Sequence, residues 1–231
     1  MDDLLDLLES DDKPFAKEQE TKPQERYTEK KDKINLWEDI DIKPIKVDTT
    51  ELHSVGKTFT FVAFGADDNT AIAEKISEIS KVLLNKGFIF RYNGDNNKVY
   101  NKILDIDLSK VEMYIPWKKF NTDVNAKMSK PEAVAYHHAA EYHKGFKKLP
   151  NSVRAILARD VHVLLGESCK NPVRFLLCYS PDGAETIKTL KFATTGNISF
   201  SISICDLIGI PVFNLKNDDA LSRLSEYLKT I

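Results

Sequence analysis

Hydrophobic positions from residue 57 onward alternate between two periods, and this alternation is the main signal in the chain. Short runs rich in β-branched and aromatic residues, such as KTFTFVAF at 57–64 and RFLLCY at 174–179, are typical of buried strands. Between them, apolar residues recur at intervals of three and four, the spacing of a helix with one buried face. The pattern predicts strands at 57–64, 88–92, 111–115, 174–179 and 210–215, and helices at 71–85, 98–104, 130–146, 150–165, 198–207 and 220–229. Strands that alternate with helices indicate parallel crossovers, so residues 57–231 are predicted to form one doubly wound α/β domain with a mainly parallel sheet.

The chain before Gly56 has no glycine and lacks this alternation. Residues 1–33 are mostly charged and polar, a composition that cannot bury enough apolar surface to offset the entropy of ordering, so they are predicted to be a disordered arm. Residues 34–56 carry apolar residues in partial alternation, which favours an extended segment packed on the edge of the core. A linear motif held out for a partner is the alternative for that segment.

Leucines stand among the acids of residues 1–12, namely Leu4, Leu5, Leu7 and Leu8. Their spacing places Leu4, Leu7 and Leu8 on one helical face, which would dock into the groove of a protein partner. A helix of this length does not persist alone in water, so an acidic tail that aids solubility is the other interpretation.

Charge and composition narrow the class of protein. Of 231 residues, 42% are hydrophobic, and 33 basic residues against 35 acidic ones give a formal net charge of -2. A dedicated non-specific nucleic-acid binder is normally basic, so that class is disfavoured. A local basic patch could still bind nucleic acid, and the candidate residues are Lys144, Lys147, Lys148 and Arg154. The alternative is that these residues form a solvated helix face.

The three cysteines and the apolar runs indicate the compartment. Cys169, Cys178 and Cys205 are too few for a disulfide scaffold and are interpreted as reduced core thiols. No apolar run approaches the roughly 18 residues of a membrane helix, and the first residues are acidic where a secretory signal is basic. The sequence predicts a soluble, cytoplasmic protein with no membrane contact.

Four loops combine a glycine with small hydrogen-bonding side chains: 65–70, 93–97, 180–183 and 194–197. They are expected to end strands at the carboxyl edge of the sheet, where ligands bind in open parallel sheets. The stretch TTGNIS at 194–199 opens a predicted helix, whose N–H groups favour a phosphate. For each loop the alternative is an ordinary turn or helix cap. The chain has no G-x-G-x-x-G, no G-x-x-x-x-G-K-[ST] and no G-x-S-x-G, so dinucleotide dehydrogenases, P-loop ATPases and α/β-hydrolases do not fit.

Three runs carry a family resemblance: ARDVHVLLG at 158–166, NPVRFLLCYSPDGAE at 171–185 and TTGNISFSISICDLIGIPVFNL at 194–215. They resemble the SLOG superfamily, a Rossmann-like group that includes the DNA-processing protein A and the LOG nucleotide hydrolases, and most of all its uncharacterised bacteriophage members. The resemblance covers roughly residues 57–215. It implies a Rossmann-like fold and a phage origin, and hence the host cytoplasm and a host or phage protein as the partner of residues 1–12.

The resemblance also implies a site for a nucleotide-derived ligand or a strand of nucleic acid at the glycine loops. Its residues would be Gly65, Asp67 and Asn69 in the first loop, Gly94 in the second, Ser180, Asp182 and Gly183 in the third, Thr194, Thr195, Gly196 and Ser199 in the fourth, and Arg159 in the preceding helix. Ser199 would reach a phosphate from one turn further on. Arg159, which is followed by Asp160, either faces the ligand or forms a surface ion pair of little weight.

Departures from the family pattern argue against catalysis. The hydrolases of the family carry P-G-G-x-G-T-x-x-E, and this chain has no glutamate in the matching stretch. The second loop also lacks the aspartate of the family's G-A-D. We therefore expect binding or sequestration of a nucleotide-derived ligand without turnover, with no catalytic residue and no cofactor. The alternatives are a DNA-processing accessory factor that binds single-stranded DNA, an N-glycosidic hydrolase, and an inhibitor that acts on a host protein through the arm.

Histidines are clustered in the predicted helix at 130–146, where His137, His138 and His143 accompany Glu141. Their spacing is not that of the paired histidines of a zinc helix, so we expect no metal site and histidines that face solvent or cap the helix.

Overall fold

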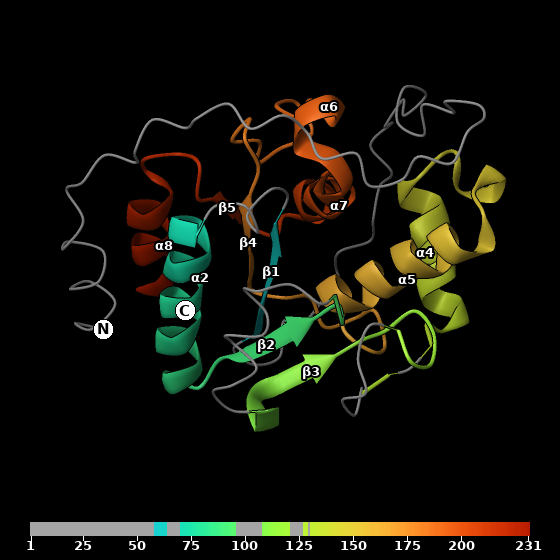
Figure 1. Cartoon of the computed structure of the whole chain (residues 1–231), viewed down its shortest axis with the longest axis horizontal. Coiled ribbons are helices and arrows are strands. Elements are labelled where there is room, and N and C mark those ends of the chain that lie inside the picture. The colour runs from blue at the N-terminus through green and yellow to red at the C-terminus, as the bar shows by residue number, and fades with distance from the viewer. Residues whose placement is uncertain (1–57, 64–69, 96–107, 121–126, 129) are drawn as a thin grey trace.

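A computed structural model describes residues 58–63, 70–95, 108–120, 127–128 and 130–231 (Figure 1). The predicted arm at 1–33, the extended segment at 34–56 and the helix at 98–104 lie outside these residues.

The described residues form an α/β fold built on one parallel sheet. The strands are β1 Thr58–Ala63, β2 Ile89–Tyr92, β3 Val111–Met113, β4 Phe175–Tyr179 and β5 Val212–Asn214. Their order is β3-β2-β1-β4-β5, and every neighbouring pair is parallel. The predicted doubly wound fold is confirmed and each predicted strand is present, although β3 and β5 are three residues long, where five and six were predicted.

Helices cover both faces of the sheet. One face carries α2 Thr70–Asn85 and α8 Ala220–Leu228, while α4 Ala133–Tyr142, α5 Asn151–Leu165 and α7 Ser199–Ile208 lie on the other (Figure 1). Shorter elements are η3 Leu108–Lys110, η4 Phe146–Lys148, α6 Phe192–Thr195 and η5 Gly196–Ile198. In the part of the chain that the structure describes, no helix has both the length and the apolar character needed to cross a membrane.

Alternate side chains of β4 build the two halves of the core. Phe175, Leu177 and Tyr179 pack with α2 and α8, whereas Leu176 and Cys178 pack with α5 and α7. Because both faces are covered, the whole strand is buried and its sequence is a continuous apolar run. The three cysteines are free and buried, as the sequence predicts.

The predicted helix at 130–146 is too long by several residues at each end. Helix α4 ends at Tyr142, where His143 takes an extended conformation (φ -128°, ψ 99°). Gly145 follows and starts η4, since glycine is a poor helix former. The expectation of solvent-facing or capping histidines is confirmed for His137, which is exposed, and for His143, which is the C-cap residue of α4, although the side chain of His143 is buried.

His162 of α5 gives the fold a dependence on pH. Its ring is fully buried; Nε2 accepts the Glu132 N–H (3.1 Å), so Nδ1 carries the proton that faces the Gly166 carbonyl (3.1 Å). Burial lowers the pKa of His162, so below about pH 6.5 the unfolded chain binds a proton that the folded chain does not. The contribution of His162 to the free energy of unfolding is therefore fully present above that pH and is lost as the pH falls below it.

We expect His162→Gln to reduce this loss. Between about pH 7.5 and about pH 5.5, the wild-type protein should lose up to about 1.4 kcal/mol more unfolding free energy than the variant. Urea titrations of both proteins at the two pH values measure the difference, and other titrating groups cancel in the comparison. Equal losses in the two proteins would contradict the assignment.

Candidate functional site

The strand order reverses between β1 and β4, and the carboxyl ends of those strands define the candidate site. The first predicted loop, with Gly65, Asp67 and Asn69, lies outside the described residues. The loops that follow β4 and β5 are described, and so are residues 93–95 of the loop after β2; these segments carry dense polar networks.

Asp182, three residues after β4, is the common acceptor of the third and fourth predicted loops. Its Oδ1 accepts Ser180 Oγ (2.7 Å) and the Ala184 N–H (3.3 Å), and its Oδ2 accepts Thr194 Oγ1 (2.9 Å) and Thr195 Oγ1. Burial alone would raise the pKa of Asp182, but the hydrogen bonds, led by that of Thr195, hold it below its usual value. The carboxylate is ionised at neutral pH and fastens the two loops together.

The fourth loop differs from its prediction. Residues 194–197 do not follow a strand, because Thr194 and Thr195 end α6 and Gly196 begins η5. Ser199 is fully buried, and its hydroxyl donates to the Gly196 carbonyl (2.6 Å) within the turn. Thr194 is exposed, so its hydroxyl is the one that reaches the surface here.

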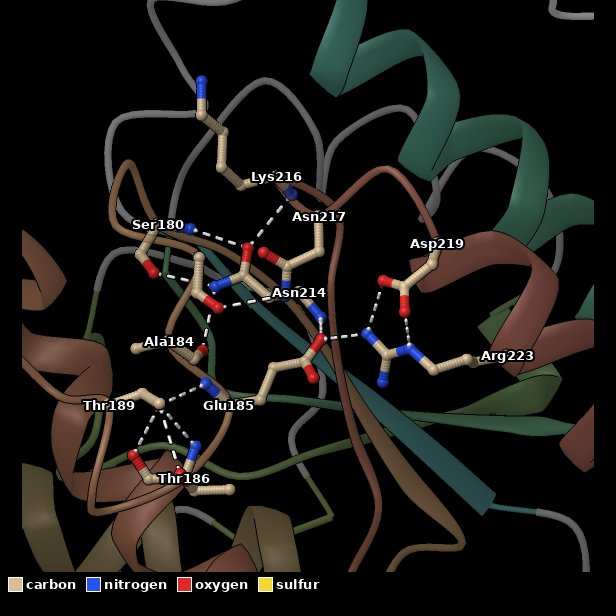
Figure 2. A network of polar contacts seen from close by, with 11 residues as sticks. Ser180, Ala184, Glu185, Thr186, Thr189, Asn214, Lys216, Asn217, Asp219 and Arg223 are labelled. Carbon is tan, nitrogen blue, oxygen red and sulfur yellow. Dashed lines mark hydrogen bonds and ion pairs between the residues drawn. The ribbon is translucent and has the colours of Figure 1, made fainter.

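Asn214, the last residue of β5, is the hub of a second network (Figure 2). Its buried amide donates to Ser180 Oγ (2.8 Å) and to the Ala184 carbonyl (2.9 Å). Its Oδ1 accepts the N–H groups of Ser180 (3.3 Å) and Lys216 (3.1 Å). The four bonds use the full hydrogen-bonding capacity of the side chain and tie the loop after β4 to the end of β5.

Glu185 extends this network to α8. Its Oε1 accepts the Asn214 N–H (2.8 Å) and Arg223 Nη2 (2.7 Å), and Arg223 in turn pairs with Asp219 (Figure 2). The Arg223 guanidinium lies 5.8 Å from the centre of the Phe213 ring. The loop from Ser180 to Glu185 is thus fixed on both sides.

Gly183 is required inside that loop. It has a φ of +65°, and its carbonyl accepts Asn217 Nδ2 (3.0 Å). A Cβ at this position would overlap with Asn217 Oδ1. Gly183, the glycine of the SPDG run that the sequence analysis selected, is therefore needed for the conformation of the loop.

A third network lies at the carboxyl end of β2 and contains the predicted residues Gly94 and Arg159. Asn93 Nδ2 donates to Asp95 Oδ2 (2.7 Å) and Asn93 Oδ1 accepts the Asp95 N–H (3.1 Å). Arg159 Nη1 donates to the Asn93 carbonyl (2.5 Å) and to Asp95 Oδ1 (3.2 Å). Only 4% of the Arg159 side chain is exposed, so the interpretation as a surface ion pair is wrong.

Asp160 completes this network. Its Oδ1 lies 2.9 Å from Arg159 Nε, so two acids flank one guanidinium. Burial raises the pKa of Asp160 to about 6, although Arg159 acts in the opposite direction. The group is ionised above that pH and depends on Arg159 for its charge partner.

Gly94 is a sterically restricted position of the site. Its φ is +73°, and a Cβ there would overlap with Ile115 Cγ2, whereas Gly87 has a similar φ of +84° with no atom within 4 Å of its Cβ position. We expect Gly94→Ala to lower the unfolding free energy by about 2 kcal/mol more than Gly87→Ala, because only the first change adds a clash to the backbone strain. Chemical denaturation of the two variants measures this, and equal losses would contradict it.

Comparison with protein-family models, with curated proteins and with solved structures gives no match to this chain. The resemblance to the SLOG superfamily therefore stays a prediction. The fold and the position of the networks define the class of protein: an α/β protein of Rossmann-like topology.

The histidines of α4 were the other candidate for a chemical site. His137 Nε2 and His138 Nδ1 lie 3.2 Å and 3.1 Å from the carboxylate oxygens of Glu141. Across the described residues, no group of three His, Cys, Asp or Glu side chains is placed to hold a metal ion.

Proposed function

We propose that the carboxyl edge of the sheet binds a nucleotide-derived ligand and holds it without turnover. The observation that carries the proposal is the reversal of strand order between β1 and β4, with the Ser180–Glu185 loop fixed directly after β4. Open parallel sheets bind ligands at this place because the loops on either side of the reversal diverge.

The hydrogen-bond networks support binding because they preorganise the edge. The Asp182 carboxylate holds the loop after β4 against α6 by accepting threonine hydroxyls, and the neutral amide of Asn214 holds the loop against β5. A loop that is already ordered loses little entropy when a ligand arrives, which favours affinity. Thr194, exposed and bonded to Asp182, offers its hydroxyl oxygen to a polar ligand.

The state of the carboxylates supports binding without turnover. Asp182 accepts from Ser180, Thr194, Thr195 and Ala184, and its lowered pKa makes it a poor general acid. Glu185 Oε1 is engaged by Arg223 and by a backbone N–H. These side chains serve to shape the loop.

The proposal has two further parts that rest on the sequence. Leu4, Leu5, Leu7 and Leu8 contact a protein partner, and the protein acts in the cytoplasm. Deletion of residues 1–33 should leave ligand binding intact and abolish partner capture.

A thermal-shift screen of nucleotides, nucleotide derivatives and short single-stranded DNA tests the main proposal. A saturating ligand should raise the melting temperature by several degrees through mass action, and chromatography of the incubated nucleotide should show no product. Thr194→Val should weaken binding about tenfold, the effect of one lost hydrogen bond, while Thr230→Val near the C-terminus, where the hydroxyl donates to the Tyr227 carbonyl, should not. No shift with any nucleotide, in a folded protein, would overturn the proposal, and released base would replace it with the hydrolase alternative.

A further inference from the structure

Asp95 lies in the predicted loop 93–97 but is not among the residues predicted to bind the ligand. It follows β2 by three residues, and β2 is the direct neighbour of β1 at the strand reversal. Asp95 Oδ2 accepts from Asn93 and Oδ1 accepts from Arg159, so the carboxylate is held in one orientation. The side chain is nevertheless 40% exposed. A carboxylate has about four acceptor positions, so oxygen lone pairs remain for a donor from outside.

Trp117 provides an exposed ring on the segment after β3. Among the described residues, it and the C-terminal Ile231 are the large hydrophobic side chains that are exposed, with Trp117 at 39%. The turn that presents it is closed by the Phe120 N–H on the Trp117 carbonyl (3.2 Å). An aromatic ligand can stack on the ring of an exposed indole.

Phe120 joins the exposed ring to the fixed carboxylate. Trp117 packs edge-on against Phe120, with ring centres 4.9 Å apart. The Arg159 guanidinium, which holds Asp95, lies 5.6 Å from the centre of the same Phe120 ring. The ring, the guanidinium and the carboxylate therefore belong to one continuous packed group at the ends of β2 and β3.

We infer that the ligand is a ribonucleotide, whose ribose hydroxyls donate to Asp95 and whose base stacks on Trp117. The inference rests on the proposed function and names its ligand class. A carboxylate that is fixed by donors and still exposed suits the vicinal hydroxyls of ribose, each of which brings a proton to donate. Stacking on an indole accepts any base, so the sugar provides the selectivity.

Charge orients the ligand along the edge. Asp95 and Asp160 surround the single guanidinium of Arg159, which leaves an excess of negative charge in this group above the pKa of Asp160. Phosphate groups are repelled from it and therefore extend away from it along the edge of the sheet.

Calorimetric titration with matched pairs of ribonucleoside and 2′-deoxyribonucleoside monophosphates tests the inference on the unmodified protein. We expect each ribonucleotide to bind about tenfold more tightly than its deoxy counterpart, the effect of one lost hydrogen bond to a charged group. Asp95→Asn should remove this preference, and Glu226→Gln, an exposed acid on α8, should keep it. Trp117→Ala should weaken every nucleotide about tenfold, and Trp117→Phe should restore most of the affinity.

The outcomes separate the inference from the proposed function. Nucleotide binding could depend on Thr194 while ribonucleotides and deoxyribonucleotides bind with equal affinity and substitution of Asp95 or Trp117 leaves that affinity unchanged. That result overturns the inference and leaves the proposed function standing. If no nucleotide binds, the proposed function is overturned and the inference with it. If a single-stranded oligonucleotide binds through Trp117 while mononucleotides do not, the ligand is a nucleic-acid strand and the inference is wrong.

Discussion

Replacing Asn214 by alanine is expected to lower the free energy of unfolding by about 3–5 kcal/mol, because the change leaves several buried polar groups without partners. The N–H groups of Ser180 and Lys216 lose their acceptor, and Ser180 Oγ and the Ala184 carbonyl lose a donor. Asn214 is fully buried, so water cannot replace these bonds without entering the space that the side chain leaves. The loss should also release the loop after β4 from β5.

The matched control is Asn217→Ala in the same turn. Asn217 makes one side-chain hydrogen bond of this network, to the Gly183 carbonyl, and is only partly buried. Its removal should cost about 1 kcal/mol. Chemical denaturation of the two variants measures the difference, and similar losses would show that Asn214 is not the hub of the edge.

Arg159→Met is the second change with a large expected effect, a loss of about 3 kcal/mol of unfolding free energy. Methionine keeps much of the apolar stem, but it leaves the partly buried Asp160 without its ion partner and frees the Asn93 carbonyl and Asp95. Removing one partner of a buried pair typically costs 3–5 kcal/mol, and we place this case at the lower end because Asp95 is 40% exposed.

Arg223→Met is the control, since Arg223 pairs with Glu185 and Asp219 while its own side chain is 38% exposed. Exposed pairs contribute about 0–1 kcal/mol. Urea titration at neutral pH compares the two variants. Losses of equal size would mean that the burial of Arg159 does not matter to its ion pairs.

Periodicity was sufficient to predict the strands and most helices. The run RFLLCY has the continuous apolar character of a strand covered on both faces, and it forms β4. Gly87 and Gly209 mark helix ends in the sequence, and both adopt a positive φ there. The end of α4 was missed because the apolar spacing continues to Phe146 while the backbone turns at His143.

Long-range polar contacts could not be predicted in the same way. Arg91 stands in the apolar strand FIFRY and is buried, because Glu112 and the Asn171 carbonyl accept its N–H groups. The Glu185–Arg223 pair spans 38 residues of sequence. No local sequence pattern predicts which residues pair with Arg91 or with Arg223.

The candidate site was predicted in part. Ser180, Asp182, Thr194 and Thr195 were selected as members of separate loops, and the structure brings them together on the Asp182 carboxylate. Asn214 was missed because it follows the apolar residues of β5 and resembles the end of an ordinary strand. Trp117, four residues after the end of β3, was missed because no local pattern distinguishes an exposed aromatic residue from one that packs in the core.

Hydrogen–deuterium exchange with saturating AMP or ATP tests the location of binding most directly. If a nucleotide binds at the carboxyl edge, peptides from 180–191 and 212–217 should exchange more slowly with the nucleotide present. Peptides from the body of α2, within Thr70–Asn85, should be unchanged by local binding. Unchanged exchange in the loops after β4 and β5, in a protein shown by calorimetry to bind the nucleotide, would place the ligand elsewhere and contradict the account.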